Sequence, residues 1–431
     1  MVRQKRRSKG KGKVAASMIP ITRPYIGKKE EIAVSQVLRS GWLTQGPKVR
    51  QFEDIFAAYV GAKYACAVSS CTTALHLALI AVGVKPGDVV ITVSHSFIAT
   101  ANSIRYCQAE PVFADIDPDT FNMSVVCLDE ILNDDCQMRN GQLYYKKVSD
   151  IVTGASFLRN FSCKDKMRVG RVAAILPVHQ MGMPCDLKEI LRLASKFKLP
   201  VVEDAACAIG SEIKINSGWE KIGKPHGDIA CFSFHPRKII TAGEGGMLTT
   251  NNPRYHKLFR LLRHHGMTTS DRERHNASKV IFEKYITLGY NYRLTDIQAV
   301  ISIEQMKKLP AIINERRKIA GIYRRELEDV PWLELPKEPA YCKSNWQSYA
   351  VRVKNNANLS RDRLMQHLLD AGISTRRGIM NAHQELPYKF SKWNLPVSEK
   401  ARDNSMLLPI FNSLSISQLK YISRMLHKIK K

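Results

Sequence analysis

The sequence alternates between strand-like and helix-like segments over residues 50–250, and this alternation limits the fold more than any other feature. Phe52, Ile55, Phe56 and Tyr59 recur at the spacing of one helix face, and residues 64–69 then form a short apolar run. Strands separated by helices favour a mostly parallel sheet covered on both faces, so the sequence predicts an α/β fold. Further predicted strands are residues 89–93, 111–114, 173–178, 200–203, 229–234 and 247–250, and a helix is predicted over 74–82.

The pattern changes near residue 265, which suggests a second domain in this chain of 431 residues. Residues 266–288 are predicted to form a polar loop, and residues 296–308 and 312–327 have the periodicity of two long helices. The C-terminal part mixes predicted strands with helices. We therefore predict a flexible basic tail over residues 1–16, a large α/β domain over 17–265 and a smaller α+β domain over 266–431.

Basic residues outnumber acidic residues by 66 to 39, which gives a formal net charge of +27. Such an excess predicts anionic partners or substrates without distinguishing nucleic acids, membranes and phosphorylated metabolites. No acid interrupts the basic residues from Arg3 to Lys13. We expect a solvated extension there, with a nucleic-acid contact, an anionic-membrane contact and a transit peptide as alternatives. No apolar stretch is long enough to predict a membrane span.

The cysteine pattern bears on the compartment and on metals. The chain has 10 cysteines, and none of them forms a Cys-x-x-Cys pair. A zinc ribbon or a redox dithiol is therefore not expected, and we predict no metal site. Scattered, reduced cysteines are typical of a cytoplasmic protein.

Three polar groups follow segments that should end at one edge of the sheet, where open parallel sheets bind ligands. Residues 70–73, Ser-Cys-Thr-Thr, open a helix whose free N–H groups and hydroxyls suit an anion. Asp204 and Lys238 each follow an apolar strand, and Arg237 precedes the lysine. Taken singly, each group has an ordinary explanation: N-capping for the hydroxyls and Asp204, and a solvated charge for Lys238.

Together these groups meet the requirements of pyridoxal 5′-phosphate (PLP). A desolvated Lys238 with a cation beside it can become a neutral amine, which forms Schiff bases with aldehydes. Asp204 would face the pyridine nitrogen and keep it protonated, and the helix N-terminus would bind the phosphate. Phe97, just beyond the strand at 89–93, is placed to cover the ring face.

A series of motifs also runs in a fixed order along the chain. They are Ile19-Pro20-Ile21-Thr22-Arg23-Pro24, Ser40-Gly41-Trp42-Leu43-Thr44-Gln45-Gly46-Pro47, Ser70-Cys71-Thr72-Thr73-Ala74-Leu75-His76-Leu77, Phe97-Ile98-Ala99-Thr100-Ala101-Asn102, Pro177-Val178-His179, Glu203-Asp204-Ala205-Ala206, Ser233-Phe234-His235-Pro236-Arg237-Lys238 and Gly289-Tyr290-Asn291-Tyr292-Arg293-Leu294-Thr295-Asp296. In this order they resemble the DegT/StrS family of PLP-dependent nucleotide-sugar aminotransferases, and the resemblance covers nearly all of residues 19–431.

The resemblance implies the aspartate-aminotransferase-like fold of type I PLP-dependent transferases. It also implies a homodimer with active sites at the subunit interface. Lys238 would be the lysine that binds the cofactor and shuttles a proton, Asp204 the partner of the ring nitrogen, and Phe97 the stacking residue.

The resemblance also assigns the phosphate site. Cys71 and Thr72 would bind the phosphate through backbone amides, Ser233 would be a further ligand, and Asn291 would reach it from the other subunit. Two residues depart from the family pattern. Cys71 stands where glycine is common, and Cys207 stands where glutamine or histidine commonly bonds the phenolic oxygen of the cofactor.

A longer segment than the family usually has lies between Asp119 and Ala173. It contains Asn140-Gly141, a signal for a tight hairpin turn, ahead of Leu143. We predict an inserted hairpin or surface loop.

The activity implied by the resemblance is a ping-pong transfer of an amino group from glutamate to a keto-sugar, most closely a nucleoside-diphosphate 4-keto-6-deoxy sugar used in polysaccharide biosynthesis. The diphosphate would account for part of the positive charge. Candidate substrate-binding residues are His179, for which a packed structural role is the alternative, and Arg376, Arg377 and His383.

Two other functions remain as alternatives. One is a sugar dehydratase of the same family, in which histidine replaces the cofactor lysine. The other is a non-catalytic relative acting as a regulator or nucleic-acid-binding protein, which the basic tail would suit. The presence of both Asp204 and Lys238 favours the aminotransferase.

Overall fold

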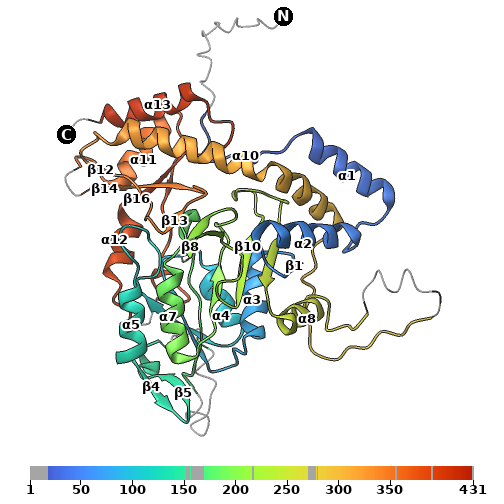
Figure 1. The fold of residues 1–431 in the computed structure, drawn as a ribbon. Helices are drawn as coiled ribbons and strands as arrows, with labels where there is room; N and C mark the ends of the chain where they lie inside the picture. The colour runs from blue at the N-terminus through green and yellow to red at the C-terminus, as the bar shows by residue number, and fades with distance from the viewer. Residues whose placement is uncertain are drawn as a thin grey trace, which may run out of the picture.

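The computed structural model describes residues 18–151, 156, 169–215, 218–269, 278, 280–354, 357–389 and 392–429, and all structural statements below concern these residues. The predicted basic tail, residues 1–16, lies outside them. Figure 1 shows two parts of the molecule connected by the long helix α10 (Asp296–Leu327). We call the part around the central sheet the large domain, and the part around the sheet near the C-terminus the small domain.

The central layer of the large domain consists of two sheets that continue into each other. Their strand orders are β1-β11-β10-β7 and β3-β2-β6. Parallel bridges from Ile175 to Val201 and from Val178 to Asp204 connect them. The pairs β10–β7, β2–β3 and β2–β6 are parallel, whereas β11 is antiparallel to both neighbours, so the predicted mostly parallel sheet is confirmed. The strands are β1 (Tyr64–Val68), β2 (Val89–Val93), β3 (Glu110–Ala114), β6 (Val172–Ile175), β7 (Val202–Asp204), β10 (Ile229–Ser233) and β11 (Gly246–Thr250).

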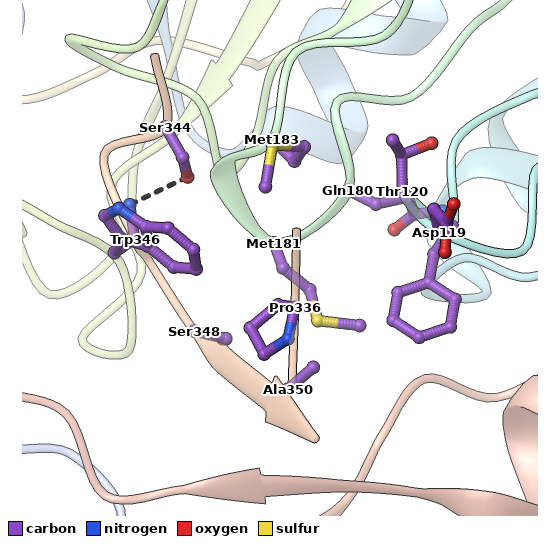
Figure 2. A pocket seen from close by; sticks show the side chains of 11 residues that line it. Asp119, Thr120, Gln180, Met181, Met183, Pro336, Ser344, Trp346, Ser348 and Ala350 are labelled. Atoms are coloured by element: carbon purple, nitrogen blue, oxygen red, sulfur yellow. Dashed lines mark hydrogen bonds between the residues drawn. The ribbon is translucent and has the colours of Figure 1, made fainter. Parts of the chain in front are cut away.

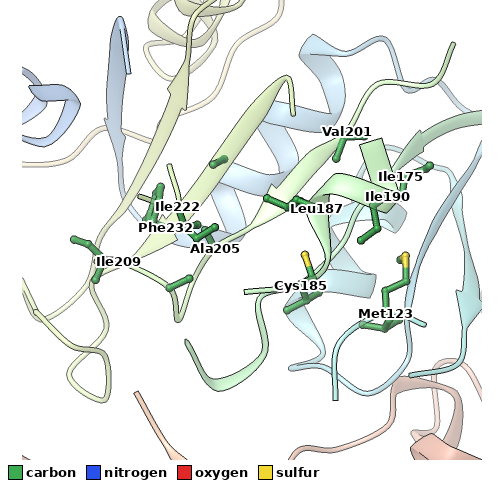
Figure 3. Packing of buried hydrophobic residues seen from close by; sticks show 14 of the residues in the cluster. Met123, Ile175, Cys185, Leu187, Ile190, Val201, Ala205, Ile209, Ile222 and Phe232 are labelled. Atoms are coloured by element: carbon green, nitrogen blue, oxygen red, sulfur yellow. The ribbon is translucent and has the colours of Figure 1, made fainter. Parts of the chain in front are cut away.

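Successive residues of these strands belong to different hydrophobic cores, because side chains alternate between the two faces of a sheet. Val90 and Leu248 lie in a core with α3, α4 and α8, while their neighbours Ile91 and Met247 lie in a core with α2, α5 and α7. Figure 3 shows part of the second core, where apolar side chains of α7 and the strands lie together. The helices of this domain are α1 (Lys28–Ser40), α2 (Pro47–Val60), α3 (Cys71–Ala81), α4 (Ala99–Tyr106), α5 (Val125–Asp134), α6 (Val148–Ile151), α7 (Leu187–Phe197) and α8 (Pro253–Leu262), with a short 3-10 helix, η2 (Gln180–Gly182).

The small domain has an antiparallel sheet of strand order β12-β14-β16-β15. Ile19, near the start of the described chain, belongs to the core of this domain and forms a parallel bridge with Ile373. In the described parts of the chain, no helix is both long and apolar enough to cross a membrane. The elements are β12 (Leu333–Glu334), β14 (Tyr349–Val353), β15 (Arg376–Arg377), β16 (Ser405–Leu408), α11 (Arg361–Asp370), α12 (Pro396–Asn404), α13 (Ile416–His427) and the 3-10 helix η3 (Ala382–Gln384).

Helix α10 corrects one prediction, since the two helices expected over 296–308 and 312–327 are a single helix that contains Pro310. A proline inside a helix removes one hydrogen bond and costs about 3 kcal/mol. The flanking residues Leu309 and Ile312 are buried in the core of the large domain, and their packing offsets that cost. The helix then continues into the core of the small domain.

The segment predicted to carry a hairpin does so. Strands β4 (Cys136–Arg139) and β5 (Gln142–Tyr145) pair antiparallel, and both turn residues, Asn140 and Gly141, have positive φ angles of 48° and 75°. The predicted hairpin is therefore confirmed. Residues 152–155 and 157–168 of the same segment lie outside the described residues. A further sheet, of order β13-β8-β9, contains β8 (Glu212–Ile215), β9 (Gly218–Lys221) and β13 (Cys342–Lys343).

The segment predicted as a polar loop, 266–288, contains no helix or strand within its described residues. It is less polar than expected. The side chains of Val280, Phe282 and Leu288 are each more than 80% exposed, and Tyr285 and Ile286 are exposed as well. The predicted loop is thus confirmed. The prediction that it is polar is wrong for residues 280–288.

A buried ion pair fastens α2 to α8. The Glu53 carboxylate accepts hydrogen bonds from Ala67 N at 2.9 Å, from Arg260 Nη1 at 3.1 Å and from Arg263 Nη1. Burial alone would raise the pKa of Glu53, but the charges of the two arginines lower it below its ordinary value. Replacing Glu53 with glutamine should lower the free energy of unfolding by about 3–5 kcal/mol, because it leaves buried guanidinium charge unpaired.

Chemical denaturation at neutral pH would measure this change. The control is Asp54→Asn, which removes the neighbouring exposed pair with Arg50 and should change stability by less than about 1 kcal/mol. Equal effects of the two substitutions would contradict the prediction.

Candidate active site

The carboxyl ends of neighbouring strands bring the predicted site residues to one edge of the sheet. Strand β7 ends at Asp204, strand β10 ends at Ser233 shortly before Lys238, and the chain after β1 enters α3 at Cys71. Asp204 pairs with Cys231 of β10, and Ser233 at the end of β10 pairs with Gly246, where an added Cβ would lie 2.7 Å from Cys71 N. The ends of β7 and β10 and the start of α3 therefore meet at one edge of the sheet. Burial raises the pKa of the Cys71 thiol well above its ordinary value, and the charge of Asp204 also raises it.

Lys238 is half-buried, and its Nζ donates a hydrogen bond to Cys207 Sγ at 3.0 Å. A turn positions the backbone, since Lys238 N donates to His235 O at 2.8 Å. Burial acts to lower the pKa of Lys238, but the hydrogen bond to Cys207 and the charges of Cys207, Cys71 and Asp204 raise it overall.

Asp204 is buried, and its carboxylate has two donors within the described chain. Thr100 Oγ1 donates to Oδ2 at 2.8 Å, and Ala206 N donates to Oδ1 at 3.1 Å. Thr100 is in turn bonded to Ser96 at 2.8 Å between hydroxyl oxygens. Burial raises the pKa of Asp204 despite these bonds. Each carboxylate oxygen accepts one of these hydrogen bonds, which leaves lone pairs for a further N–H donor.

The N-terminus of α3 has the features of an anion site. Ser70 caps the helix by accepting a hydrogen bond from Thr73 N at 3.2 Å. The N–H groups of Cys71 and Thr72 have no acceptor among the described residues. A Cβ on Gly246 would lie 2.3 Å from Ser70 O, so only glycine lets the start of α3 approach β11 this closely.

Two more predicted residues lie around this edge. Ser233 pairs with Gly246 between β10 and β11, and its hydroxyl accepts a hydrogen bond from His235 N at 3.4 Å. Phe97 lies in the loop between β2 and α4, and its side chain is 65% exposed although it is large and apolar. Free amides at a helix N-terminus, a buried carboxylate, a lysine amine and an uncovered aromatic ring fit the phosphate, ring nitrogen, aldehyde and ring face of PLP.

His179 lies behind Asp204 and is fully enclosed. Its Nε2 is 3.1 Å from Glu203 Oε2, and its Nδ1 accepts from Cys185 N at 3.1 Å. Burial acts to lower the pKa of His179, but Cys185 and Glu203 raise it above its ordinary value. His179 N also donates to Asp204 O at 3.0 Å. With both ring nitrogens bonded inside the protein, His179 is placed to support Asp204.

The remaining predicted residues come from other elements. Arg376 and Arg377 form β15 and are exposed. His383 is buried, with Nδ1 2.6 Å from Ser94 Oγ and Nε2 3.1 Å from Glu399 Oε1. It therefore joins the small domain to the loop that carries Phe97. Asn291 is exposed and forms an isolated bridge with His264, next to the apolar segment 280–288.

Sequence reasoning missed two supporting residues. Thr100, the donor to Asp204, lies on the first turn of α4, three positions after Phe97, and that proximity is a usable signal. The second is Asn345, whose Nδ2 donates to Cys207 O at 2.8 Å and to Ile209 O at 2.9 Å. No feature of the sequence pointed to this residue.

Ser344 and Trp346, on either side of Asn345, line a small cavity. Trp346, whose N–H donates to Ser344 Oγ at 3.0 Å, lines it with Met181 and Gln180 of η2 (Figure 2). The adjoining Gln347 donates from Nε2 to Arg237 O at 2.9 Å. The small domain thus holds the loops that carry Cys207 and Lys238.

Comparison with known proteins identifies one family over most of the chain. A model of the DegT/DnrJ/EryC1/StrS aminotransferase family matches residues 24–427. The spore coat polysaccharide biosynthesis protein SpsC of Bacillus subtilis is 34% identical, over 92% of this chain and 93% of that protein.

Solved structures agree with the sequence match. PseC of Helicobacter pylori, an aminotransferase involved in the biosynthesis of pseudoaminic acid, superposes with a TM-score of 0.80 at 25% identity, over 96% of this chain and 99% of that chain. Spr1654 of Streptococcus pneumoniae in its PLP form has a TM-score of 0.78 at 25% identity, over 96% and 100% of the two chains, and it has also been solved in a PMP form.

Proposed function

The chain belongs to the DegT/DnrJ/EryC1/StrS aminotransferase family, and on that basis we propose that it transfers an amino group from glutamate to a nucleotide-linked keto-sugar. It has the PLP-dependent transferase fold, and it is an aminotransferase that uses PLP. The observation that carries the proposal is the convergence of the strand ends that carry Asp204 and Lys238 with the N-terminus of α3 at one sheet edge.

When bound, PLP supplies an electron-withdrawing ring that makes the α-proton of an amino donor acidic. In the proposed mechanism, the Asp204 carboxylate would hold a proton on the ring nitrogen, and Thr100 fixes the orientation of that carboxylate through its 2.8 Å hydrogen bond. Lys238 Nζ would hold the cofactor and would carry the proton of the donor α-carbon. The exposed ring of Phe97 would exclude water from the site.

Several residues are proposed to bind the phosphate and the sugar nucleotide. Cys71 and Thr72 hold the phosphate through their free N–H groups, with Ser233 beside them. Arg376 and Arg377 present exposed guanidinium groups on β15 that suit a diphosphate. We assign His179 and His383 a structural role in supporting the site, because their ring nitrogens are hydrogen-bonded to protein groups.

The choice of a sugar acceptor draws on the relatives. SpsC is named for polysaccharide biosynthesis and PseC for the biosynthesis of pseudoaminic acid. The formal charge of +27 suits a substrate that carries a diphosphate. We propose a nucleoside-diphosphate 4-keto-6-deoxy sugar as the acceptor. A dehydratase of the same family is disfavoured because residue 238, the proposed cofactor lysine, is not a histidine.

We further propose a homodimer in which Asn291 reaches the phosphate site of the other subunit. Residues 280–288 expose several large apolar side chains just before Asn291, and a second copy of the chain would cover them. Cytoplasmic location is part of the same proposal, since every cysteine in the described residues is unpaired, as expected in a reducing compartment.

Visible absorption of the PLP-loaded protein tests the function. Adding glutamate should remove the absorption band of the resting protein, and adding the keto-sugar nucleotide should restore it. Aspartate serves as the control donor and should act much more weakly. Bleaching by aspartate alone would overturn the glutamate assignment, and a band that no keto-sugar nucleotide restores would overturn the acceptor assignment.

A further inference from the structure

A second pocket, which we call the α10 pocket, lies between the later part of helix α10 and the segment around β13, and its volume is about 300 Å³. This volume is at the lower end of the range of small-molecule sites. Of the described residues that line it, none belongs to the proposed sites for PLP and the sugar nucleotide. The lining residues are Arg317, Ala320, Gly321 and Arg324 of α10, and Glu338, Lys343 and Trp346 of the segment around β13.

Small residues of α10 leave the space for this pocket. The four residues of α10 that line it follow the spacing of a single helix face. A Cβ on Gly321 would lie 4.0 Å from Arg325 Nη1, so the space beside the helix is open at this position. Ala320 adds only a methyl group. The hollow therefore depends on two side chains that cannot fill it by changing rotamer.

Arg317 offers a hydrogen-bond donor to a ligand in the pocket. Its Nε donates to Ser344 O at 2.9 Å, which fixes the orientation of the guanidinium group. Its Nη2 is buried and has no hydrogen-bond acceptor among the described residues. Buried polar groups are normally paired, so an acceptor that entered the pocket would satisfy this N–H group.

The side chains around the pocket carry an excess of positive charge. Arg317, Arg324 and Lys343 line it together with one carboxylate, that of Glu338. Lys343 Nζ also lies 3.4 Å from Glu212 Oε2, so part of its charge is offset. The two guanidinium groups remain, and they suit an oxyanion because their N–H groups can bind two of its oxygen atoms at once.

The neighbouring Arg316 supports the same interpretation. It is buried, and its Nη1 donates to two carbonyl groups, Trp346 O at 3.1 Å and Gln347 O at 3.2 Å. Burial lowers the pKa of Arg316 to about 10, because a guanidinium charge is costly away from water. An anion beside Arg317 would stabilise this buried charge as well.

We propose that the α10 pocket is a second ligand site, which binds a small phosphorylated metabolite through its phosphoryl group. A phosphoryl group has a charge of about −1.5 to −2 at neutral pH and offers three acceptor oxygens, one for each of Arg317, Arg324 and Lys343. A carboxylate has less charge and only two oxygens. The volume of the pocket leaves room for the organic part of the metabolite, whereas inorganic phosphate would leave that part empty.

Isothermal titration calorimetry of the PLP-loaded protein tests the inference. The probes are glucose 6-phosphate, inorganic phosphate and succinate, and we expect glucose 6-phosphate to bind most tightly. Arg324→Ala should weaken its binding about tenfold or more, because a charge-assisted contact is lost. Arg324 is exposed, so its removal should leave the fold intact. Equal affinities of this variant and the wild type would overturn the inference, and so would succinate or inorganic phosphate binding as tightly as the ester.

Two variants test the pocket in other ways. Glu338→Gln removes the carboxylate but keeps an oxygen that can accept from Ser344 N, so binding should become several-fold tighter. Gly321→Leu changes no charge and fills the open space beside the helix, so binding should be lost. Weaker binding by Glu338→Gln, or unchanged binding by Gly321→Leu, would contradict the proposed site.

Two controls separate this pocket from the proposed active site. Lys318→Ala removes an exposed lysine of α10 that does not line the pocket, and it should bind glucose 6-phosphate with wild-type affinity. Arg376→Ala alters the proposed sugar-nucleotide site and should also bind it normally. Loss of binding in Arg376→Ala, with normal binding in Arg324→Ala, would place the phosphate at the sugar-nucleotide site and overturn the inference.

Discussion

Replacing Lys238 with alanine should lower the rate of amino-group transfer by about 10⁴-fold or more while leaving the fold intact. The variant lacks both the amine that binds the cofactor and the carrier of the α-proton. The folded state loses little, because the side chain forms a single hydrogen bond, to Cys207, in the described structure. Single-turnover kinetics with glutamate would measure the loss, and thermal unfolding would check the fold.

Two further variants make this test specific. Lys238→Arg keeps the positive charge but cannot act as the amine nucleophile, so it should be as inactive as Lys238→Ala. Lys257→Ala removes an exposed lysine of α8 and should retain wild-type activity. Retention of even one-tenth of the activity in Lys238→Ala would rule out the proposed mechanism.

Replacing Asp204 with asparagine should lower kcat by about 10²- to 10³-fold, which is the usual effect of losing one preorganised electrostatic contact. The amide has the same shape but carries no charge, so it cannot hold a proton on the ring nitrogen. Steady-state kinetics with glutamate would measure the loss. Because burial raises the pKa of Asp204, wild-type activity should also fall on acidification at a higher pH than for an ordinary aspartate.

Thr100→Val separates charge from orientation. It removes the 2.8 Å hydrogen bond to Asp204 Oδ2 but leaves the carboxylate in place, so its effect should be about tenfold. Acidic residues elsewhere provide the control: Asp54→Asn on α2 should not change kcat. If Asp204→Asn and Thr100→Val reduced the rate equally, the charge of Asp204 would have no special part in the reaction.

Local sequence patterns were sufficient to predict the strands of the central sheet. The strand predicted at 89–93 is β2 with the same bounds, and the Asn140-Gly141 turn is present. Strand ends could be located from apolar runs, and parallel strands expose their carboxyl ends at one edge. That rule, applied to Asp204 and Lys238, brought both residues to one predicted site.

Contacts between distant parts of the chain were decided only by the tertiary structure. Thr100 and Asp204 are 104 residues apart, Asn345 and Cys207 are 138 apart, and His383 and Ser94 are 289 apart. A side chain that bonds such a distant partner has the same local pattern as one facing solvent.

The sequence by itself therefore determined the strands of the central sheet, the α/β class and the residues at the strand ends, because hydrophobic periodicity and turn chemistry act over a few neighbours. The continuity of α10 through Pro310 and the contact of Cys207 with Lys238 were decided by the tertiary structure. The first depends on packing in the cores of both domains, and the second depends on two loops of the large domain that meet at the sheet edge. No local pattern records either contact.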